Sequence, residues 1–296
     1  MTLPPPLRSN ARVSTSPDSR PYRPTLTVAL IFVFVLVIAP YVNRLAPLFG
    51  GSAEEDRSDD PFGALQNLQP LADLLFDDFA FELIAVLAFI TVMRWWRLLQ
   101  FEPYPLRPRA FGALPIATAA LFTVATLIGV IATPRPDWRL LALQAAFMLV
   151  VAVIEEFCWR GVAVIGLRGS GVPEWLVWLL TSAGFAAMHF LNLFAGADVE
   201  GTLGQVVFTF LLGSACYLAR RVAGIWLAVA VHFTNNYLQV AASGSAESPL
   251  FDLVNATAIG GQALMALALP MTIVVLILEA RRTRRASRSA MATPSG

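Results

Sequence analysis

Hydrophobic residues along this chain gather into long runs, and short segments between the runs hold most of the charged residues. A run of about 20 apolar residues is long enough to cross a lipid bilayer as a helix. The pattern therefore predicts an all-α fold, a polytopic membrane helical bundle of about eight transmembrane helices. Their approximate limits are 26–42, 79–93, 110–133, 139–167, 175–194, 203–219, 223–240 and 253–278.

The composition supports a membrane protein. Hydrophobic residues make up 57% of the 296 residues and charged residues only 14%, whereas soluble domains carry about 25% charged residues. We expect an integral membrane domain over 26–280, a disordered cytoplasmic tail over 1–25 and a basic cytoplasmic tail over 281–296. The net charge is +1 and the basic residues are dispersed, so no nucleic-acid partner is expected. Both cysteines, Cys158 and Cys216, lie in apolar runs, and a structural disulfide is not expected.

The arginines predict the orientation, because cytoplasmic loops of membrane proteins carry an excess of basic residues. We expect the protein in the plasma membrane with both termini in the cytoplasm. This orientation also puts on the cytoplasmic side the segment 94–109, Arg168, the Arg220-Arg221 pair and the final arginine cluster. An acidic loop then lies outside. It holds five acids within 54–60 and, in this interpretation, also Asp73, Asp77 and Asp78.

One run contains charges in its middle, in the stretch Glu155-Glu156-Phe157-Cys158-Trp159-Arg160. A charge at bilayer depth costs about 2.5–3.5 kcal/mol or more, so such residues usually mark function. Glu156 and Arg160 are four residues apart and can form an ion pair on one helix face. Glu155 points to a different face and has no counter-ion on its own helix.

The only two histidines, His189 and His232, also lie inside predicted spans, at depths that can match Glu155. Asn236 follows His232 by one turn on the same face, and Asn192 follows His189. Either histidine alone is explained by a hydrogen bond between helices. One histidine together with Glu155 can hold and deprotonate a water molecule. The other histidine and an amide side chain can then stabilise an oxyanion. The set therefore predicts hydrolysis of an amide in an active-site cavity within the membrane.

Three motifs carry a resemblance. Glu155–Arg160 is similar to the EExxxR motif of the CAAX-protease and bacteriocin-processing (CPBP, or Abi) family, and Phe185–His189 and His232–Asn236 are similar to its FxxxH and HxxxN motifs. The motifs agree in order and spacing over a core of about 140–240. The resemblance implies an intramembrane endopeptidase that acts on CAAX-type or bacteriocin-leader-like substrates. If the family's roles carry over to this chain, Glu155 and His189 would activate water, and His232 and Asn236 would stabilise the oxyanion. Glu156 and Arg160 would support the architecture.

The resemblance leaves the cofactor open, since the family is described both as metalloprotease and as metal-independent glutamate protease. The chain has no HExxH sequence, and we expect no metal. The alternative is a zinc ion held by Glu155, His189 and His232. The expected partners are a peptide or C-terminal protein segment as substrate, and membrane lipid.

Two other classes of function remain open. A proton-coupled transporter would use Glu155 and the histidines as a relay, although no internal repeat of the kind found in such carriers is evident. A non-catalytic membrane scaffold or immunity protein would bind rather than cleave.

Overall fold

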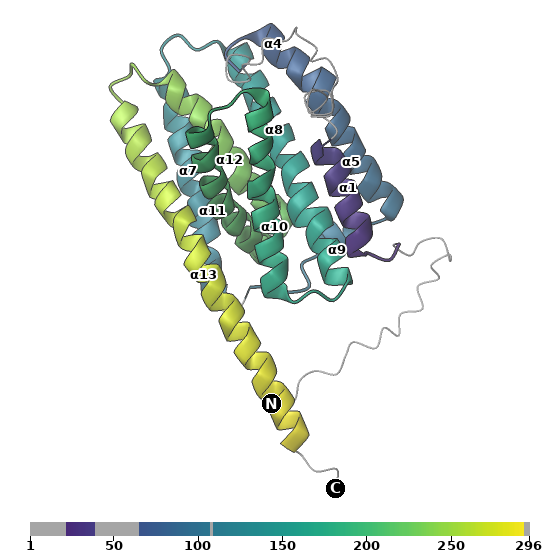
Figure 1. The fold of residues 1–296 in the computed structure, drawn as a ribbon. Helices are drawn as coiled ribbons and strands as arrows, with labels where there is room; N and C mark the ends of the chain where they lie inside the picture. The colour runs from purple at the N-terminus through teal and green to yellow at the C-terminus, as the bar shows by residue number, and fades with distance from the viewer. Residues whose placement is uncertain (1–21, 39–64, 107–108, 293–296) are drawn as a thin grey trace.

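The computed structural model describes residues 22–38, 65–106 and 109–292, and among them every regular element is a helix. Figure 1 shows these helices as one bundle, with α13 reaching beyond the others at the C-terminal end. The predicted all-α, polytopic membrane bundle is confirmed.

The elements follow one another along the chain as α-helices, interrupted by short π and 3₁₀ segments. In order they are α1 (Leu26–Ile38), α4 (Leu68–Asp73), η4 (Leu74–Phe79), α5 (Ala80–Met93), α6 (Trp96–Gln100), η5 (Arg109–Gly112), α7 (Ala113–Ala132), α8 (Trp138–Glu156), η6 (Phe157–Ala163), α9 (Val164–Gly169), α10 (Glu174–Met188), η7 (His189–Ala195), α11 (Val199–Ala223), α12 (Ile225–Gly244) and α13 (Phe251–Ala292).

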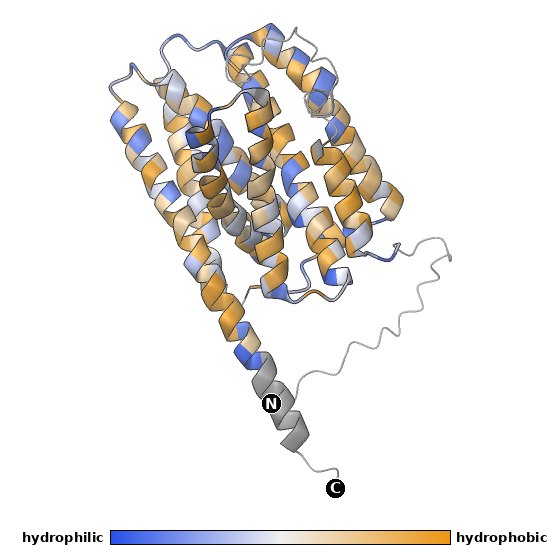
Figure 2. Ribbon diagram, in the orientation of Figure 1, coloured by the Kyte–Doolittle hydropathy of each residue, from blue (hydrophilic) through white to orange (hydrophobic). Residues whose placement is uncertain are grey.

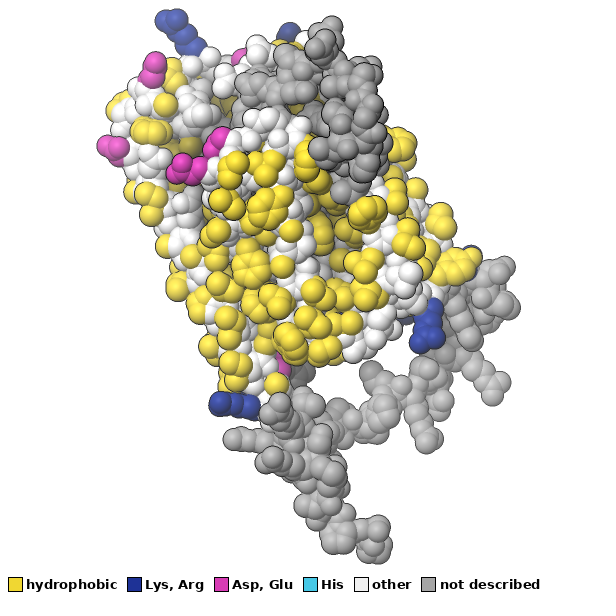
Figure 3. All heavy atoms as spheres, in the orientation of Figure 1, with side chains coloured by type: hydrophobic (Ala, Val, Ile, Leu, Met, Phe, Trp, Pro, Cys, Tyr) yellow, Lys and Arg dark blue, Asp and Glu magenta, His cyan; other side chains and the backbone are white. Residues whose placement is uncertain are grey.

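The outer surface of the bundle is apolar. Large hydrophobic side chains such as Phe81, Ile131 and Val207 are more than 60% exposed, and the face drawn in Figure 3 is mostly yellow between charged ends. Figure 2 shows the same division along the ribbons, with hydrophilic colour concentrated near the connections. A contiguous apolar surface of this extent is unfavourable in water and suits contact with lipid chains.

Within the part of the chain that the structure describes, five helical stretches are long and apolar enough to cross a membrane: 110–132, 138–169, 174–194, 199–223 and 251–282. Helix α1 is shorter, the stretch from α4 to α5 carries four acidic residues, and α12 carries His232 and two asparagines. The count of eight spans therefore stays a prediction.

Two sequence predictions fall differently in the structure. Asp73, Asp77 and Asp78 were assigned to a loop, but they lie in α4 and η4, because the apolar residues between them pack on α8. The sixth span was expected to end near 219, whereas α11 continues to Ala223. Residues 1–21 and the acidic segment 54–60 lie outside the described residues.

The predicted cytoplasmic tail ends in ordered structure. The backbone N–H of Tyr22 donates to Met93, and the indole of Trp95 donates to the Tyr22 carbonyl at 2.9 Å. The start of α1 is thereby fixed beside the end of α5.

The predicted fourth span is one continuous helical stretch, Trp138–Gly169. Asp137 begins it by accepting hydrogen bonds from the backbone N–H groups of Arg139 and Leu140, as a helix N-cap does. Helix α12 packs against α8, α11 and α7, while α10 packs against α11, and α13 lies along α7. Helices α8, α10, α11 and α12 therefore meet around the stretch that contains the glutamate pair.

One end of the bundle holds a buried network of three arginines and three glutamates. Glu102 accepts from Arg168 at 3.0 Å and from Arg220 at 3.1 Å, and Arg221 pairs with Glu279 at 2.7 Å. Glu174 pairs with Arg168 as well. Arg220 and Arg221 are almost fully buried, so the two residues predicted to lie on the cytoplasmic side form part of the core at this end of the bundle.

Candidate active site

The glutamate pair lies where the fourth span changes its geometry. Helix α8 ends at Glu156, and the next seven residues form the π-helical segment η6. Wider π turns are rare and are frequently found at functional sites. The Arg220 guanidinium donates to the backbone carbonyl of Arg160 within this segment. The charged network at the end of the bundle is thus connected directly to the backbone that carries the pair.

Glu156 and Arg160 form the predicted ion pair. Nη1 of Arg160 lies 3.2 Å from Oε1 of Glu156, and both side chains are fully buried. The guanidinium stacks over the ring of Phe185 at 4.5 Å from its centroid, an arrangement in which the ring face attracts the cation. Gly213 of α11 leaves the space, since a Cβ atom there would approach Nη2 of Arg160 to 2.8 Å.

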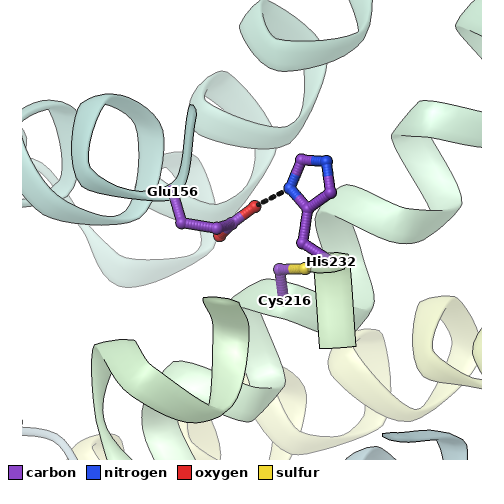
Figure 4. Close-up of side chains that lie close together, drawn as sticks. All are labelled: Glu156, Cys216 and His232. Carbon is purple, nitrogen blue, oxygen red and sulfur yellow. Dashed lines mark hydrogen bonds and ion pairs between the residues drawn. The ribbon is translucent and has the colours of Figure 1, made fainter. Parts of the chain in front are cut away.

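His232 of α12 lies between the two glutamates. Its Nδ1 is 2.9 Å from Oε1 of Glu156, and its Nε2 is 3.3 Å from Oε2 of Glu155. Figure 4 shows the first of these contacts, with the imidazole directed from α12 toward Glu156. Glu155 has no counter-ion on its own helix, as expected, and its partner comes from another helix.

Exposure distinguishes the two carboxylates. The side chain of Glu155 is 21% exposed, whereas those of Glu156 and His232 are 0% and 2% exposed. Only Glu155 can therefore meet water or a substrate without a rearrangement of the core.

His189 lies beside this cluster through the ring of Phe185, and Asn236 follows His232 by one turn on α12. The ring of His189, the first residue of η7, contacts Phe185 edge-on at 5.4 Å, and His232 contacts the same ring at 5.6 Å. Nδ1 of His189 faces the Phe185 carbonyl at 3.1 Å, which leaves Nε2 available. Asn236 accepts a hydrogen bond from the side chain of Asn235 through Oδ1, so its own N–H groups can donate elsewhere.

Among the described residues, His189 makes no hydrogen bond to Glu155. The sequence placed Asn192 near the site as well, but its side chain donates to Gln205 at 2.8 Å. The structure thus joins Glu155, Glu156, Arg160 and His232 by direct contact and places His189 behind a shared aromatic ring.

A different set of side chains offers atoms to a metal ion. Glu156, Cys216 and His232 bring ligand atoms within 4.8 Å of one another, and Figure 4 shows the Cys216 sulfur from α11 beside the other two. Cys216 was not predicted to lie at the site from the sequence. A single cysteine in an apolar span is only a weak indication that it lies near a polar cluster. The fit to a cation is poor, because the Arg160 guanidinium, 3.2 Å from Oε1 of Glu156, already balances the charge of that carboxylate and two adjacent cations repel each other.

An apolar groove runs beside the cluster on the outside of the bundle, between α5, α6, α8 and α12. It is lined by Leu83, Leu87, Trp96, Leu149, Val150, Val153, Phe157 and Trp226. Glu155 is not part of its lining, so the groove is distinct from the polar cluster.

Fold and site together define a polytopic helical membrane protein with a buried Glu–Glu–Arg–His cluster contributed by neighbouring helices. Residues 137–238, about a third of the chain, match the family described as type II CAAX prenyl endopeptidase Rce1-like. The matched range contains all three motifs. The chain thus carries an Rce1-like domain, and the resemblance to the CAAX-protease family is confirmed. No curated protein and no solved structure matches the chain.

Proposed function

We propose that this protein is an intramembrane endopeptidase that uses Glu155 to activate water. It would cleave a CAAX-type C-terminal segment or a bacteriocin-leader-like peptide. The observation that carries the proposal is the position of His232 between two glutamates, of which only Glu155 is partly exposed. The matching family supplies the general activity, a CAAX-type protease in the membrane.

In the proposed first step, the carboxylate of Glu155 takes a proton from a bound water, and the hydroxide attacks the scissile carbonyl carbon. A base in a water-poor site is weakly solvated, which strengthens its pull on the proton. His189 would hold this water through Nε2, since its Nδ1 is occupied by the Phe185 carbonyl.

The oxyanion that forms would be stabilised by His232 and Asn236. Glu156 anchors Nδ1 of His232, which directs the opposite nitrogen toward the Glu155 side of the site. A protonated His232 would present an Nε2–H donor there, and Asn236 would add its side-chain N–H. Donors fixed before reaction need no reorientation as charge develops.

Glu156 and Arg160 would support this arrangement rather than react. Arg160 also supplies the positive charge that balances Glu156, so the pair has no electrostatic need for a metal ion. We therefore propose a metal-independent reaction.

The proposed setting is the plasma membrane with both termini in the cytoplasm. The arginines of α9 and α11 gather at the same end of the bundle as the end of α13, through the network of Glu102 and Glu279. That end would face the cytoplasm under the positive-inside rule, and the substrate would enter from the surrounding lipid.

The test uses the purified full-length protein in lipid nanodiscs with a panel of quenched fluorescent peptides, farnesylated CAAX peptides and unmodified leader-type peptides. We expect cleavage of at least one class, a loss of kcat on the order of 10²–10⁴-fold in Glu155→Gln, and no loss in Glu200→Gln. Glu200 is an exposed carboxylate at the other end of α11 and is the matched control.

Two results would overturn the proposal. A wild-type protein that binds peptides but cleaves none is a scaffold or immunity-type protein, and one that carries protons across liposomes without cleavage is a transporter. Activity lost on treatment with phenanthroline and restored by stoichiometric Zn²⁺ would refute the metal-independent mechanism alone.

A further inference from the structure

A second acidic side chain lies on α5, a helix that packs against the stretch carrying Glu155. Glu82 lies in α5, within the apolar stretch Ala80–Met93, outside the residues that match the family. The signal in the sequence was a single acid in a hydrophobic run, the same kind of signal that marks Glu155.

The helix geometry directs Glu82 inward. Glu82, Val86 and Ile90 are spaced four residues apart and therefore share one face of α5. Val86 and Ile90 are the two buried residues of this helix, at 0% and 1% exposure. Glu82 is half-buried at the upper end of this inward stripe.

The stripe packs against the helix that carries the glutamate pair. Val86 and Ile90 belong to the same core cluster as Cys158 and Val162, and residues 155, 158 and 162 lie on one side of α8 and η6 by the same spacing. Glu82 interacts electrostatically with Glu155 and with the Cys158 thiol. Glu82 thus lies on the face of α5 that packs toward the helical stretch carrying Glu155.

Their surroundings differ in one decisive way. Glu155 has the imidazole of His232 at 3.3 Å, while the Glu82 carboxyl makes no hydrogen bond or ion pair within the part of the chain that the structure describes. Among the described residues, the other ionisable groups that act on Glu82 are Asp78, one turn earlier in η4, and Cys158. Neither supplies a positive charge.

Two carboxyl groups close together in a medium of low dielectric constant do not both ionise readily, and one retains a proton. The group beside a hydrogen-bond donor or cation is the better carboxylate, and the group without one keeps the proton. Neighbouring carboxyl groups in different environments divide the acid and base roles in this way in other hydrolases.

We propose that Glu82 is a further catalytic residue, the general acid that protonates the leaving amine while Glu155 acts as the base. This inference rests on the proposed function and extends it to a residue outside the three motifs. When the tetrahedral intermediate collapses, the C–N bond breaks and the amine nitrogen takes the proton of Glu82. The proton that Glu155 received from water then passes to Glu82. Water and amide are thus converted to acid and amine, and both carboxyl groups return to their starting states.

The experiment compares a peptide that the wild type cleaves with its depsipeptide analogue, in which the scissile N–H is replaced by oxygen. An alkoxide leaves far more readily than an amide anion and needs less help from an acid. We expect Glu82→Gln to lower kcat for the peptide on the order of 10²–10³-fold, with a loss for the ester smaller by about tenfold or more. Glu82→Asp, which keeps a proton donor, should recover part of the peptide activity.

Asp77→Asn is the matched control, because Asp77 is an exposed carboxylate on the same helical stretch, and its activity should match the wild type. Chemical unfolding of each variant is measured in parallel. Glu82→Gln removes an acid without a partner from the membrane, so its stability should equal or exceed that of the wild type.

Equal losses for peptide and ester in Glu82→Gln, or full activity toward both, would overturn the role of Glu82 while leaving the proposed function intact. An unfolded Glu82→Gln protein would also overturn it, since it would show a structural requirement for this carboxyl. Wild-type protein that cleaves neither substrate would instead overturn the proposed function.

Discussion

The ion pair between Glu156 and Arg160 allows a quantitative test of the site's architecture by a double-mutant cycle. The variants are Glu156→Gln, Arg160→Met and the combination of both. Glutamine keeps an oxygen that can accept hydrogen bonds from Arg160 and His232, so the first change removes mainly charge. Methionine removes the guanidinium but keeps an unbranched, apolar side chain that can lie against Phe185.

The expected magnitudes follow from complete burial. Both side chains are 0% exposed, and breaking such a pair by removing one partner typically costs about 3–5 kcal/mol, because the other charge is stranded. The free energy of unfolding should therefore fall by about 3 kcal/mol in each single variant. This value is near the lower limit of that range, because His232 still contacts residue 156. The double variant strands no charge and should lose about the same, so that the coupling energy is about 2–3 kcal/mol.

The assay is reversible unfolding in mixed micelles with increasing dodecyl sulfate, followed by circular dichroism, with cleavage measured on the same samples. All three variants should also lose activity, because His232 loses its anchor. Losses of stability that add within about 0.5 kcal/mol would refute the argument, since they would mean that the two charges do not stabilise each other.

Two further predictions concern the surroundings of this pair. Gly213→Ala should lower both stability and activity, because the added Cβ would lie 2.8 Å from Nη2 of Arg160; unfolding and cleavage assays check this, and unchanged activity would show that Arg160 can shift without harm. Glu102→Gln should cost about 3 kcal/mol in the unfolding assay, near the lower limit for a broken buried pair, because its carboxylate bonds the buried Arg220 and also Arg168, whose side chain is 10% exposed. The exposed control Glu200→Gln should cost less than about 0.5 kcal/mol, and equal losses in both variants would contradict a special role for the network.

Part of the site could be predicted from spacing along single helices. Residues four apart share a helix face, which was enough to predict the Glu156–Arg160 pair and to separate Glu155 from it. Hydrophobic run length gave the all-α membrane fold, and the three motifs led to the family that the matching domain confirms. These are local properties, which depend on the helix period and on the thickness of a bilayer.

Contacts between helices could not be predicted in this way. The rotation of α12 decides that His232 reaches both glutamates, and the rotation of α5 decides that the helix face carrying Glu82 turns toward α8. Neither rotation is fixed by the residues of that helix alone. The same limit explains Arg220 and Arg221. In sequence they end an apolar run and suggest a basic loop, but the fold brings Glu102 and Glu279 from distant segments to neutralise them.

The amino-acid sequence by itself therefore determined that this chain is a helical membrane protein and which polar residues stand within its apolar runs, where charges are uncommon because burying one in lipid is costly. Only the tertiary structure decided which of those residues are partners. Charge compensation between helices depends on how the helices pack, and packing is set by many weak apolar contacts spread over the whole bundle.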